Sequence, residues 1–229
     1  MAKLILKKVD KSLKLKISIH DGEIIRHGDI AFTVEGKAQS IVTGERLVLN
    51  CMQRMSGIAT KTAHLVNICK GTGVKILDTR KTTPGFRLLE KWAVKIGGGD
   101  NHRIGLYDMI LIKDNHVDYC GGIENAILSA NDYLKRKKKK LKIEIEVRNT
   151  KELNQVLSTG KVDRILLDNF SPEQMKQAVQ LVNKTFETEA SGGITESNIR
   201  AYAETGVDFI SIGALTHSFR SLDMSLKAF

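Results

Sequence analysis

The sequence has few of the residues that stabilise small secreted proteins. Its 229 residues include only three cysteines, Cys51, Cys69 and Cys120, an odd number with no close-spaced pair. Such a set supports neither a disulfide framework nor a thiolate zinc site. No apolar stretch reaches the length that a bilayer requires, and the N-terminal segment MAKLILKKVDKSLK is too short and too charged for a signal peptide. We therefore expect a cytoplasmic protein with reduced cysteines.

Proline is equally scarce, and both prolines stand where an element should begin or end. Pro84, followed by Gly85, is a turn signal shortly after an apolar run. Pro172 follows Ser171, the usual order of a helix-capping residue and a first helical residue. The remaining composition, 41% hydrophobic and 27% charged, is that of an ordinary globular protein.

Positive charge is abundant but uneven. The formal net charge is +10, and residues 135–140 alone supply six of these charges. This run follows a helical stretch and has no interleaved aromatic residue beyond Tyr133. Cations at the end of a helix are favourable and stay solvated. We therefore interpret the run as a solvated helix end and expect no nucleic-acid partner.

Residues 1–45 differ in pattern from the rest of the chain. Short alternating runs in this part are interrupted by Asp21-Gly22, Gly28-Asp29 and Gly36, as in a small antiparallel unit. From Gly44 the pattern becomes that of one long helix, at about residues 45–70. We expect an N-terminal lobe over residues 1–45 and a larger domain over residues 46–229, whose C-terminal tail could return to the lobe.

The larger domain alternates strand-like and helical segments, which is typical of a parallel α/β sheet. Six strand-like runs fall short of the eight in a complete (β/α) barrel. We therefore expect an α/β fold with an incomplete (open) barrel. The six runs are residues 75–79, 109–113, 142–147, 164–168, 186–190 and 208–212.

Polar residues gather at the ends of these runs, where α/β proteins bind ligands. Thr79-Arg80-Lys81 ends and follows the first run, Lys113 ends the second and Asp168 ends the fourth. Side chains alternate along a strand, so Glu144 and Glu146 of the third run share one face, with Glu146 nearer the carboxyl end.

Glycines end the last two runs. Ser191-Gly192-Gly193 follows the fifth, and Ile212-Gly213-Ala214 with His217 follows the sixth. Glycines after late strands expose backbone N–H groups to a phosphate. A lone Gly-Gly is more simply a tight turn, but its pairing with Gly213 favours a phosphate site.

Cations outnumber nucleophiles in this set. His102 and Arg103 follow three glycines between the first two runs, and no Ser-His-Asp spacing is present. Many cations with few nucleophiles suggest a small polyanionic ligand, while Glu146 and Asp168 are free to hold sugar hydroxyls or Mg²⁺. The residues alone indicate phospho-sugar or nucleotide chemistry in a barrel.

Longer motifs carry a more specific resemblance. Over residues 10 to 229 the chain resembles quinolinate phosphoribosyltransferase, the carboxylating nicotinate-nucleotide pyrophosphorylase. The matching segments are GERLVLNCMQRMSGIAT, ILDTRKTTPGFRLLEKWAVKIGGGDNHRIGLYD, LIKDNHV, IEIEV, LLDNF, ASGGIT and ISIGALTHS. The resemblance implies an N-terminal α+β open-sandwich lobe, an incomplete α/β barrel, and a homodimer or a larger oligomer such as a hexamer. Several dozen further residues are expected in the first lobe, so we expect it to be truncated here.

The resemblance implies transfer of phosphoribosyl from phosphoribosyl pyrophosphate to quinolinate, a step of de novo NAD biosynthesis. The products would be nicotinate mononucleotide, pyrophosphate and carbon dioxide, with Mg²⁺ as cofactor. Lys81, Glu146 and Asp168 would be the catalytic residues, through positioning and charge stabilisation. Glu146 and Asp168 would also hold the metal, largely through bound pyrophosphate.

The resemblance also implies a set of substrate-binding residues. Arg46, Arg80, His102, Arg103 and Lys113 would contact the two carboxylates of quinolinate, with Arg46 reaching in from a partner subunit. Lys81 would bridge the substrates, and Glu146 and Asp168 would hold ribose hydroxyls. Ser191, Gly192, Gly213 and His217 would hold the phosphate, and Thr79, Gly193, Ile212 and Ala214 complete the set.

Two other functions stay open at this point. One is a sister phosphoribosyltransferase with another anionic acceptor, although five cations are many for a single carboxylate. The other is a non-catalytic nucleotide or RNA binder that uses residues 135–140, whose binding should be sensitive to salt.

Overall fold

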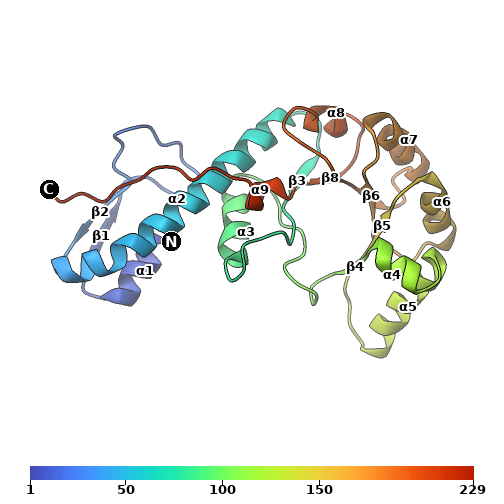
Figure 1. Cartoon of the computed structure of the whole chain (residues 1–229), viewed down its shortest axis with the longest axis horizontal. Coiled ribbons are helices and arrows are strands. Elements are labelled where there is room, and N and C mark those ends of the chain that lie inside the picture. The colour runs from blue at the N-terminus through green and yellow to red at the C-terminus, as the bar shows by residue number, and fades with distance from the viewer.

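The computed structural model describes residues 1–229, which form two parts joined by one long helix (Figure 1). Helix α2 (Ala38–Ile68) begins in the N-terminal lobe and ends against the barrel. The lobe also contains α1 (Ala2–Val9) and an antiparallel pair, β1 (Lys14–Ile17) and β2 (Phe32–Glu35). A small apolar cluster holds the lobe together: Leu6, Leu13 and Val48.

The second part is a parallel six-stranded sheet. Its order, β3-β8-β7-β6-β5-β4, is the cyclic order of a barrel opened between β3 and β4. The predicted α/β class is confirmed, and each strand lies within two residues of its predicted bounds. The strands are β3 (Lys75–Leu77), β4 (Ile110–Ile112), β5 (Ile143–Val147), β6 (Arg164–Asp168), β7 (Glu187–Ser191) and β8 (Phe209–Ser211).

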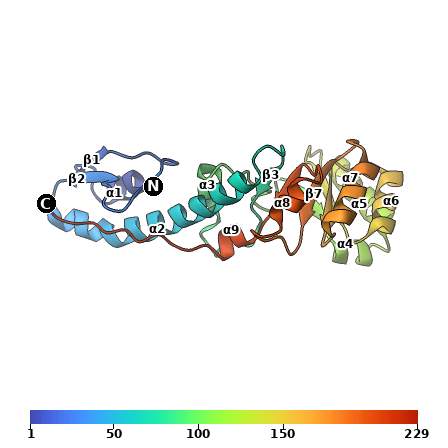
Figure 2. The same cartoon turned by 90° about the horizontal axis from the view of Figure 1, so that it is seen from above.

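Helices connect the strands (Figures 1 and 2). They are α3 (Arg87–Ile96), α4 (Asp114–Tyr119), α5 (Ile123–Arg136), α6 (Thr150–Thr159), α7 (Pro172–Val182), α8 (Ile199–Ala203) and α9 (Ala214–His217). Of these, α5, α6, α7 and α8 lie along the outside of the sheet, whereas α3 and α9 lie beside α2. At the predicted start of α7, Ser171 Oγ accepts the N–H of Gln174 and Pro172 is the first helical residue. None of the helices is both long and apolar enough to cross a membrane.

Strand β5 shows how the sheet separates packing from chemistry. Ile143, Ile145 and Val147 belong to the main apolar core. The intervening Glu144 and Glu146 face the other side, the barrel interior, because side chains alternate along a strand. The acidic residues of this strand therefore lie inside the barrel, and Glu146 is nearer its carboxyl end.

Helix α2 begins at Ala38, not near Glu45 as expected from the sequence. Gly44, taken there as the point where the pattern changes, is buried within the helix. A Cβ on Gly44 would lie 3.0 Å from Leu6 Cδ2, so the glycine gives α1 room to pack. The division at residue 45 falls inside α2, and it stays a prediction.

The C-terminal tail, residues 218–229, runs back along α2 and ends near the lobe (Figures 1 and 2). The N–H of Leu222 donates to Gln53 O at 3.2 Å, and Gln53 Nε2 donates to Met224 O at 2.9 Å. Gly57 makes this approach possible, because a Cβ there would lie 2.2 Å from Arg220 O. The tail thus connects the barrel end of α2 with its lobe end.

Candidate active site

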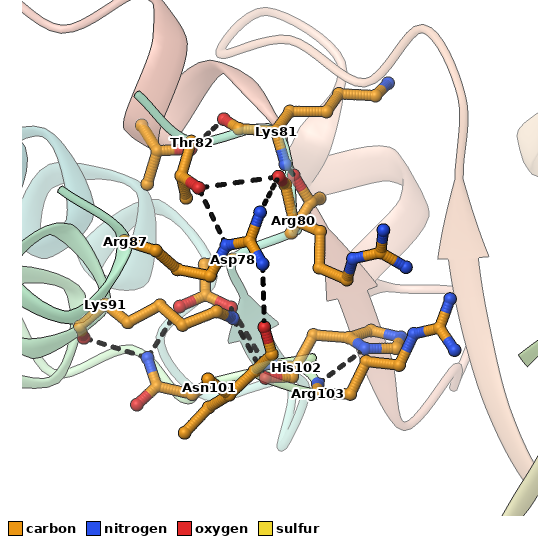
Figure 3. A network of polar contacts seen from close by, with 12 residues as sticks. Asp78, Arg80, Lys81, Thr82, Arg87, Lys91, Asn101, His102 and Arg103 are labelled. Atoms are coloured by element: carbon orange, nitrogen blue, oxygen red, sulfur yellow. Dashed lines mark hydrogen bonds and ion pairs between the residues drawn. The ribbon is translucent and has the colours of Figure 1, made fainter. Parts of the chain in front are cut away.

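Three cations lie together at and beside the end of β3. Arg80 and Lys81 follow this strand, and Arg103 lies in the loop between α3 and β4. Figure 3 shows that the charged groups of all three side chains point to the same side. Burial and then nearby Arg80 lower the pKa of Arg103, as expected for like charges held close together. This arrangement is suited to an anion.

A fully buried carboxylate, Asp78, fixes the loop that carries Arg103. Its Oδ1 accepts the backbone N–H of His102 at 2.9 Å and pairs with Lys91, and its Oδ2 accepts from Asn101 at 2.6 Å. Lys91 Nζ also donates to His102 O at 2.9 Å. Burial raises the pKa of Asp78 and lowers that of Lys91, while their pairing opposes both shifts. Asp78 therefore joins the end of β3 to the neighbouring loop (Figure 3).

Two further side chains hold the segment Arg80–Thr82. Arg87 donates from Nε to Thr82 Oγ1 at 2.9 Å and from Nη2 to Arg80 O at 3.3 Å. Thr216 on α9, itself fully buried, donates to Lys81 O at 2.8 Å. With their carbonyl groups fixed in this way, Arg80 and Lys81 present their side chains outward from a rigid segment.

The ends of β4, β5 and β6, neighbours in the sheet, carry a second group. Lys113 Nζ donates to Glu146 Oε2 at 3.0 Å. Burial and then Glu146 raise the pKa of Asp168, so the two carboxylates are close enough to repel each other. Two neighbouring carboxylates of this kind can accept hydrogen bonds from ribose hydroxyls or bind a hard cation.

The glycine-containing ends of β7 and β8 are also neighbours. Gly192 and Gly193 have φ of 89° and 59°, values that glycine adopts without strain. A Cβ at Gly213 would lie 3.0 Å from both Lys81 Cδ and His217 Nε2. The missing side chain therefore lets Lys81 reach the end of β8. The adjoining predicted residues are Thr79, Ser191, Ile212 and Ala214. Because α8 and α9 have only five and four residues, any phosphate would depend on loop N–H groups.

Two predicted residues differ in setting from the exposed cations of this edge. Arg46 is exposed in the first third of α2, and its side chain makes no hydrogen bond or ion pair within the chain. His102 is only 8% exposed, and its Nδ1 accepts the backbone N–H of Arg103 at 2.7 Å. In Figure 3 the ring points to the same side as the side chains of Arg80 and Arg103, and its contact with quinolinate stays a prediction.

The Nε2 atom of His102 lies next to a cluster of buried carboxylates that the sequence did not reveal. His102 Nε2 lies 2.9 Å from Glu144 Oε2 and 3.5 Å from Glu189 Oε1. Arg164 Nη1 donates to Glu189 Oε2 at 2.9 Å. Burial and then Glu144 raise the pKa of Glu189 to about 8. The alternation of Glu187, Glu189 and Ser191 along β7 was the available signal, since it places these residues on the interior face.

These features together define a class of protein. Cations, a carboxylate pair and a glycine loop at one edge of an open α/β barrel are the parts of a site for a phosphorylated, anionic substrate. Family models match both parts of the chain: "Quinolinate phosphoribosyl transferase, N-terminal domain" over residues 1–56 and the corresponding "C-terminal domain" over residues 58–227. The chain belongs to the quinolinate phosphoribosyl transferase family.

Individual relatives agree with this assignment. A quinolinate phosphoribosyltransferase [decarboxylating] 1b of Nicotiana tabacum is 46% identical over 241 residues, covering 99% of this chain and 68% of the relative. A probable nicotinate-nucleotide pyrophosphorylase [carboxylating] of Bacillus subtilis is 42% identical, covering 95% and 74%. The crystal structure of NadC from Streptococcus pyogenes has a TM-score of 0.93 at 37% identity, covering 99% of this chain and 79% of that one.

Proposed function

We propose that this chain is a carboxylating nicotinate-nucleotide diphosphorylase. It would transfer phosphoribosyl from phosphoribosyl pyrophosphate to quinolinate and release pyrophosphate and carbon dioxide, giving nicotinate mononucleotide for NAD biosynthesis. The observation that carries the proposal is the convergence of Arg80, Lys81 and Arg103 on one side of a rigid segment. Family membership selects this reaction among those of anionic substrates.

Quinolinate fits the cations because it carries two carboxylates on adjacent ring carbons. Guanidinium groups bind carboxylates through paired hydrogen bonds, and they do so best where water is excluded. Arg80 and Arg103 supply two such groups: the Arg103 guanidinium donates to Met109 O at 3.2 Å, and no carboxylate of this chain forms an ion pair with either residue. Lys113, already paired with Glu146, would supply a weaker third contact.

Charge development explains why cations suffice for catalysis. Displacement at the anomeric carbon makes the sugar positive and the departing pyrophosphate negative, so fixed charges lower the barrier. Lys81 lies between the Arg80 edge and the glycine loop, where it would bridge both substrates. Carbon dioxide can leave only after the ring nitrogen is quaternised, because the cationic ring then accepts the electron pair. Ribosylation therefore precedes decarboxylation.

Glu146 and Asp168 fit a magnesium ion by their oxygen donors and by their mutual repulsion, which a cation would relieve. When bound, Mg²⁺ would neutralise charge on the pyrophosphate group. Independently of the metal, these two side chains would accept hydrogen bonds from ribose hydroxyls. The loop at Gly192 and Gly193, with Ser191, Gly213 and His217, would receive the phosphate at the other end of the sugar.

We also propose that the working form is a homodimer or a larger oligomer such as a hexamer, in which Arg46 completes the site of a partner subunit. Arg46 is exposed and unpaired in its own chain. Apolar side chains near it, Val42 and Leu47, are 67% and 56% exposed. Mixing Arg46→Ala and Lys81→Ala proteins should restore activity, because one site of each mixed dimer would be intact. No recovery after subunit exchange would exclude the crossing.

A direct assay tests the reaction. Carbon dioxide release from carboxyl-labelled quinolinate should require phosphoribosyl pyrophosphate, and it should be stimulated by Mg²⁺. Quinolinate binding without release would mean that the acceptor site is present but the transfer is not performed. Absence of both would favour a sister transferase with another acceptor. Salt-sensitive RNA binding that survives Arg80→Ala would support the non-catalytic alternative.

Location in the cell stays a prediction. Relatives from plants are named chloroplastic in Arabidopsis thaliana and mitochondrial in Nicotiana tabacum. We keep the cytoplasmic location as a proposal, and fractionation of cells that express the native protein would test it.

A further inference from the structure

The strongest feature outside the substrate-facing residues is the cluster of His102, Glu144 and Glu189 inside the barrel. Both carboxylates are fully buried, and Glu144 Oε1, Glu144 Oε2 and Glu189 Oε1 have no aligned hydrogen-bond donor. Burying carboxylate oxygens without donors costs stability, and the raised pKa of Glu189, about 8, means that this residue keeps its proton at neutral pH and only part of that cost remains. A cluster of this kind next to a substrate site calls for a functional explanation.

The hydrogen bond at the other side of the ring fixes the tautomer of His102. Because Nδ1 accepts the Arg103 N–H at 2.7 Å, Nδ1 carries no proton. In the neutral ring the proton is then on Nε2, which lies between Glu144 and Glu189. Burial lowers the pKa of His102, which agrees with a neutral ring. A metal ion in the cluster would need a free electron pair on Nε2, so the tautomer disfavours it.

The Arg103 backbone is the link between this cluster and the substrate edge. The His102 N–H is held by Asp78, and the Arg103 N–H is held by the His102 ring. The Arg103 guanidinium donates from Nη1 to Met109 O at 3.2 Å and points to the Arg80 side (Figure 3). Rotation of the imidazole would release the Arg103 N–H and shift its guanidinium.

We propose that Glu144, supported by Glu189, is a positioning residue for the acceptor site: its carboxylate lies against Nε2 and holds the orientation of the His102 ring, and the ring in turn fixes Arg103 through the bond from the Arg103 N–H to Nδ1. Glu144 Oε2 is the nearer carboxylate oxygen, 2.9 Å from Nε2, in contact with the ring nitrogen but not aligned with it for a hydrogen bond. Arg164 binds the far oxygen of Glu189. Glu189 at 3.5 Å is too distant to replace it without rotation of the ring. This inference rests on the proposed binding of quinolinate by Arg103.

Substitutions at Glu144 separate positioning from stability. Glu144→Met removes both oxygens at similar volume, and we expect the Kd and KM for quinolinate to rise about tenfold or more. The Kd for phosphoribosyl pyrophosphate should stay within about twofold of the parent. Glu144→Gln keeps one acceptor oxygen and should restore most of the affinity. The control, Glu187→Met, removes a carboxylate that pairs with Arg164 but does not face His102, and should leave quinolinate binding unchanged.

Nitrogen NMR of the parent tests the same inference without any change at Glu144. The His102 signals, assigned by their loss in His102→Gln, should show a protonated Nε2 and an unprotonated Nδ1. A protonated Nδ1 would overturn the proposal even if Glu144→Met failed to fold. Equal losses of affinity for both substrates in a folded Glu144→Met protein would also overturn it. Failure of the parent itself to bind quinolinate would instead count against the proposed function.

Discussion

Two buried acidic clusters support the same loop, yet they are built in opposite ways. Asp78 is surrounded by donors: Lys91, Asn101 and the backbone of His102. Glu144 and Glu189 are equally buried, but three of their oxygens have no aligned donor. The first cluster stabilises the fold because every polar atom is satisfied. The second cluster destabilises the fold, and its contact with the His102 ring explains why such a cluster is present next to the substrate site.

The largest effect should come from breaking the satisfied cluster. Lys91→Met leaves the Asp78 carboxylate buried without its cation, and removing one partner of a buried pair costs about 3–5 kcal/mol. The free energy of unfolding, measured with urea, should fall by that amount. Lys95→Met is the matched control on the same helix, and loss of its exposed pair with Asp100 should cost at most about 1 kcal/mol. Similar losses in both variants would contradict the contrast.

A pH-dependent effect should follow from the unsatisfied cluster. The pKa of Glu189 rises from 4.5 to about 8 on folding, so the unfolded chain loses this proton first as pH rises. The parent should therefore lose stability from about pH 4.5 to pH 8, by up to roughly 1.4 kcal/mol per pH unit from this group. Glu189→Gln has no such proton, so its stability relative to the parent should increase across this range.

The neighbouring Glu187 on the same strand provides a control of opposite sign. Lys142 and Arg164 outweigh the effect of burial and lower the pKa of Glu187. Its contribution to stability is present above the unfolded pKa and is lost as pH falls through the folded value. Unfolding curves of Glu187→Gln should therefore approach those of the parent at acid pH. A relative stability of Glu189→Gln that does not change with pH would contradict the assignment of the raised pKa.

A smaller effect is expected where one hydrogen bond holds the catalytic segment. Thr216→Val keeps the side-chain shape but removes the donor to Lys81 O, which should cost about 1 kcal/mol of stability. The ratio kcat/KM should also fall in protein that is still fully folded, because Lys81 lies on that segment. Thr205→Val, which removes a bond to Tyr202 O away from the site, is the control. Equal kinetics in the two variants would show that Thr216 has no part in positioning Lys81.

The sequence was informative where function depends on residues at strand ends. Arg80, Lys81, Glu146 and Asp168 could be placed at one edge because parallel strands end together. The same alternation along the strand placed Glu144 inside the barrel. It could not identify the residues that contact Glu144, because His102 and Glu189 come from other parts of the chain. Pairings across the fold are not encoded in local spacing.

One misreading and one residue that drew no prediction have a local physical cause. Gly44 was taken as a change of element, but it lies within α2 because Leu6 packs against it. Lys91 is a charged residue on the buried face of α3, which weakens the apolar pattern of that helix. In both cases a tertiary contact overrides the usual meaning of the residue.

A calorimetric titration of each substrate into the parent and into Arg103→Ala tests whether the Arg80–Arg103 edge binds the acceptor. If the Arg80–Arg103 edge binds the acceptor, the variant should lose about tenfold or more in quinolinate affinity, as expected for a lost charged contact. Its affinity for phosphoribosyl pyrophosphate should stay close to that of the parent. Equal losses for both substrates, or none for quinolinate, would contradict the assignment of this edge to the acceptor.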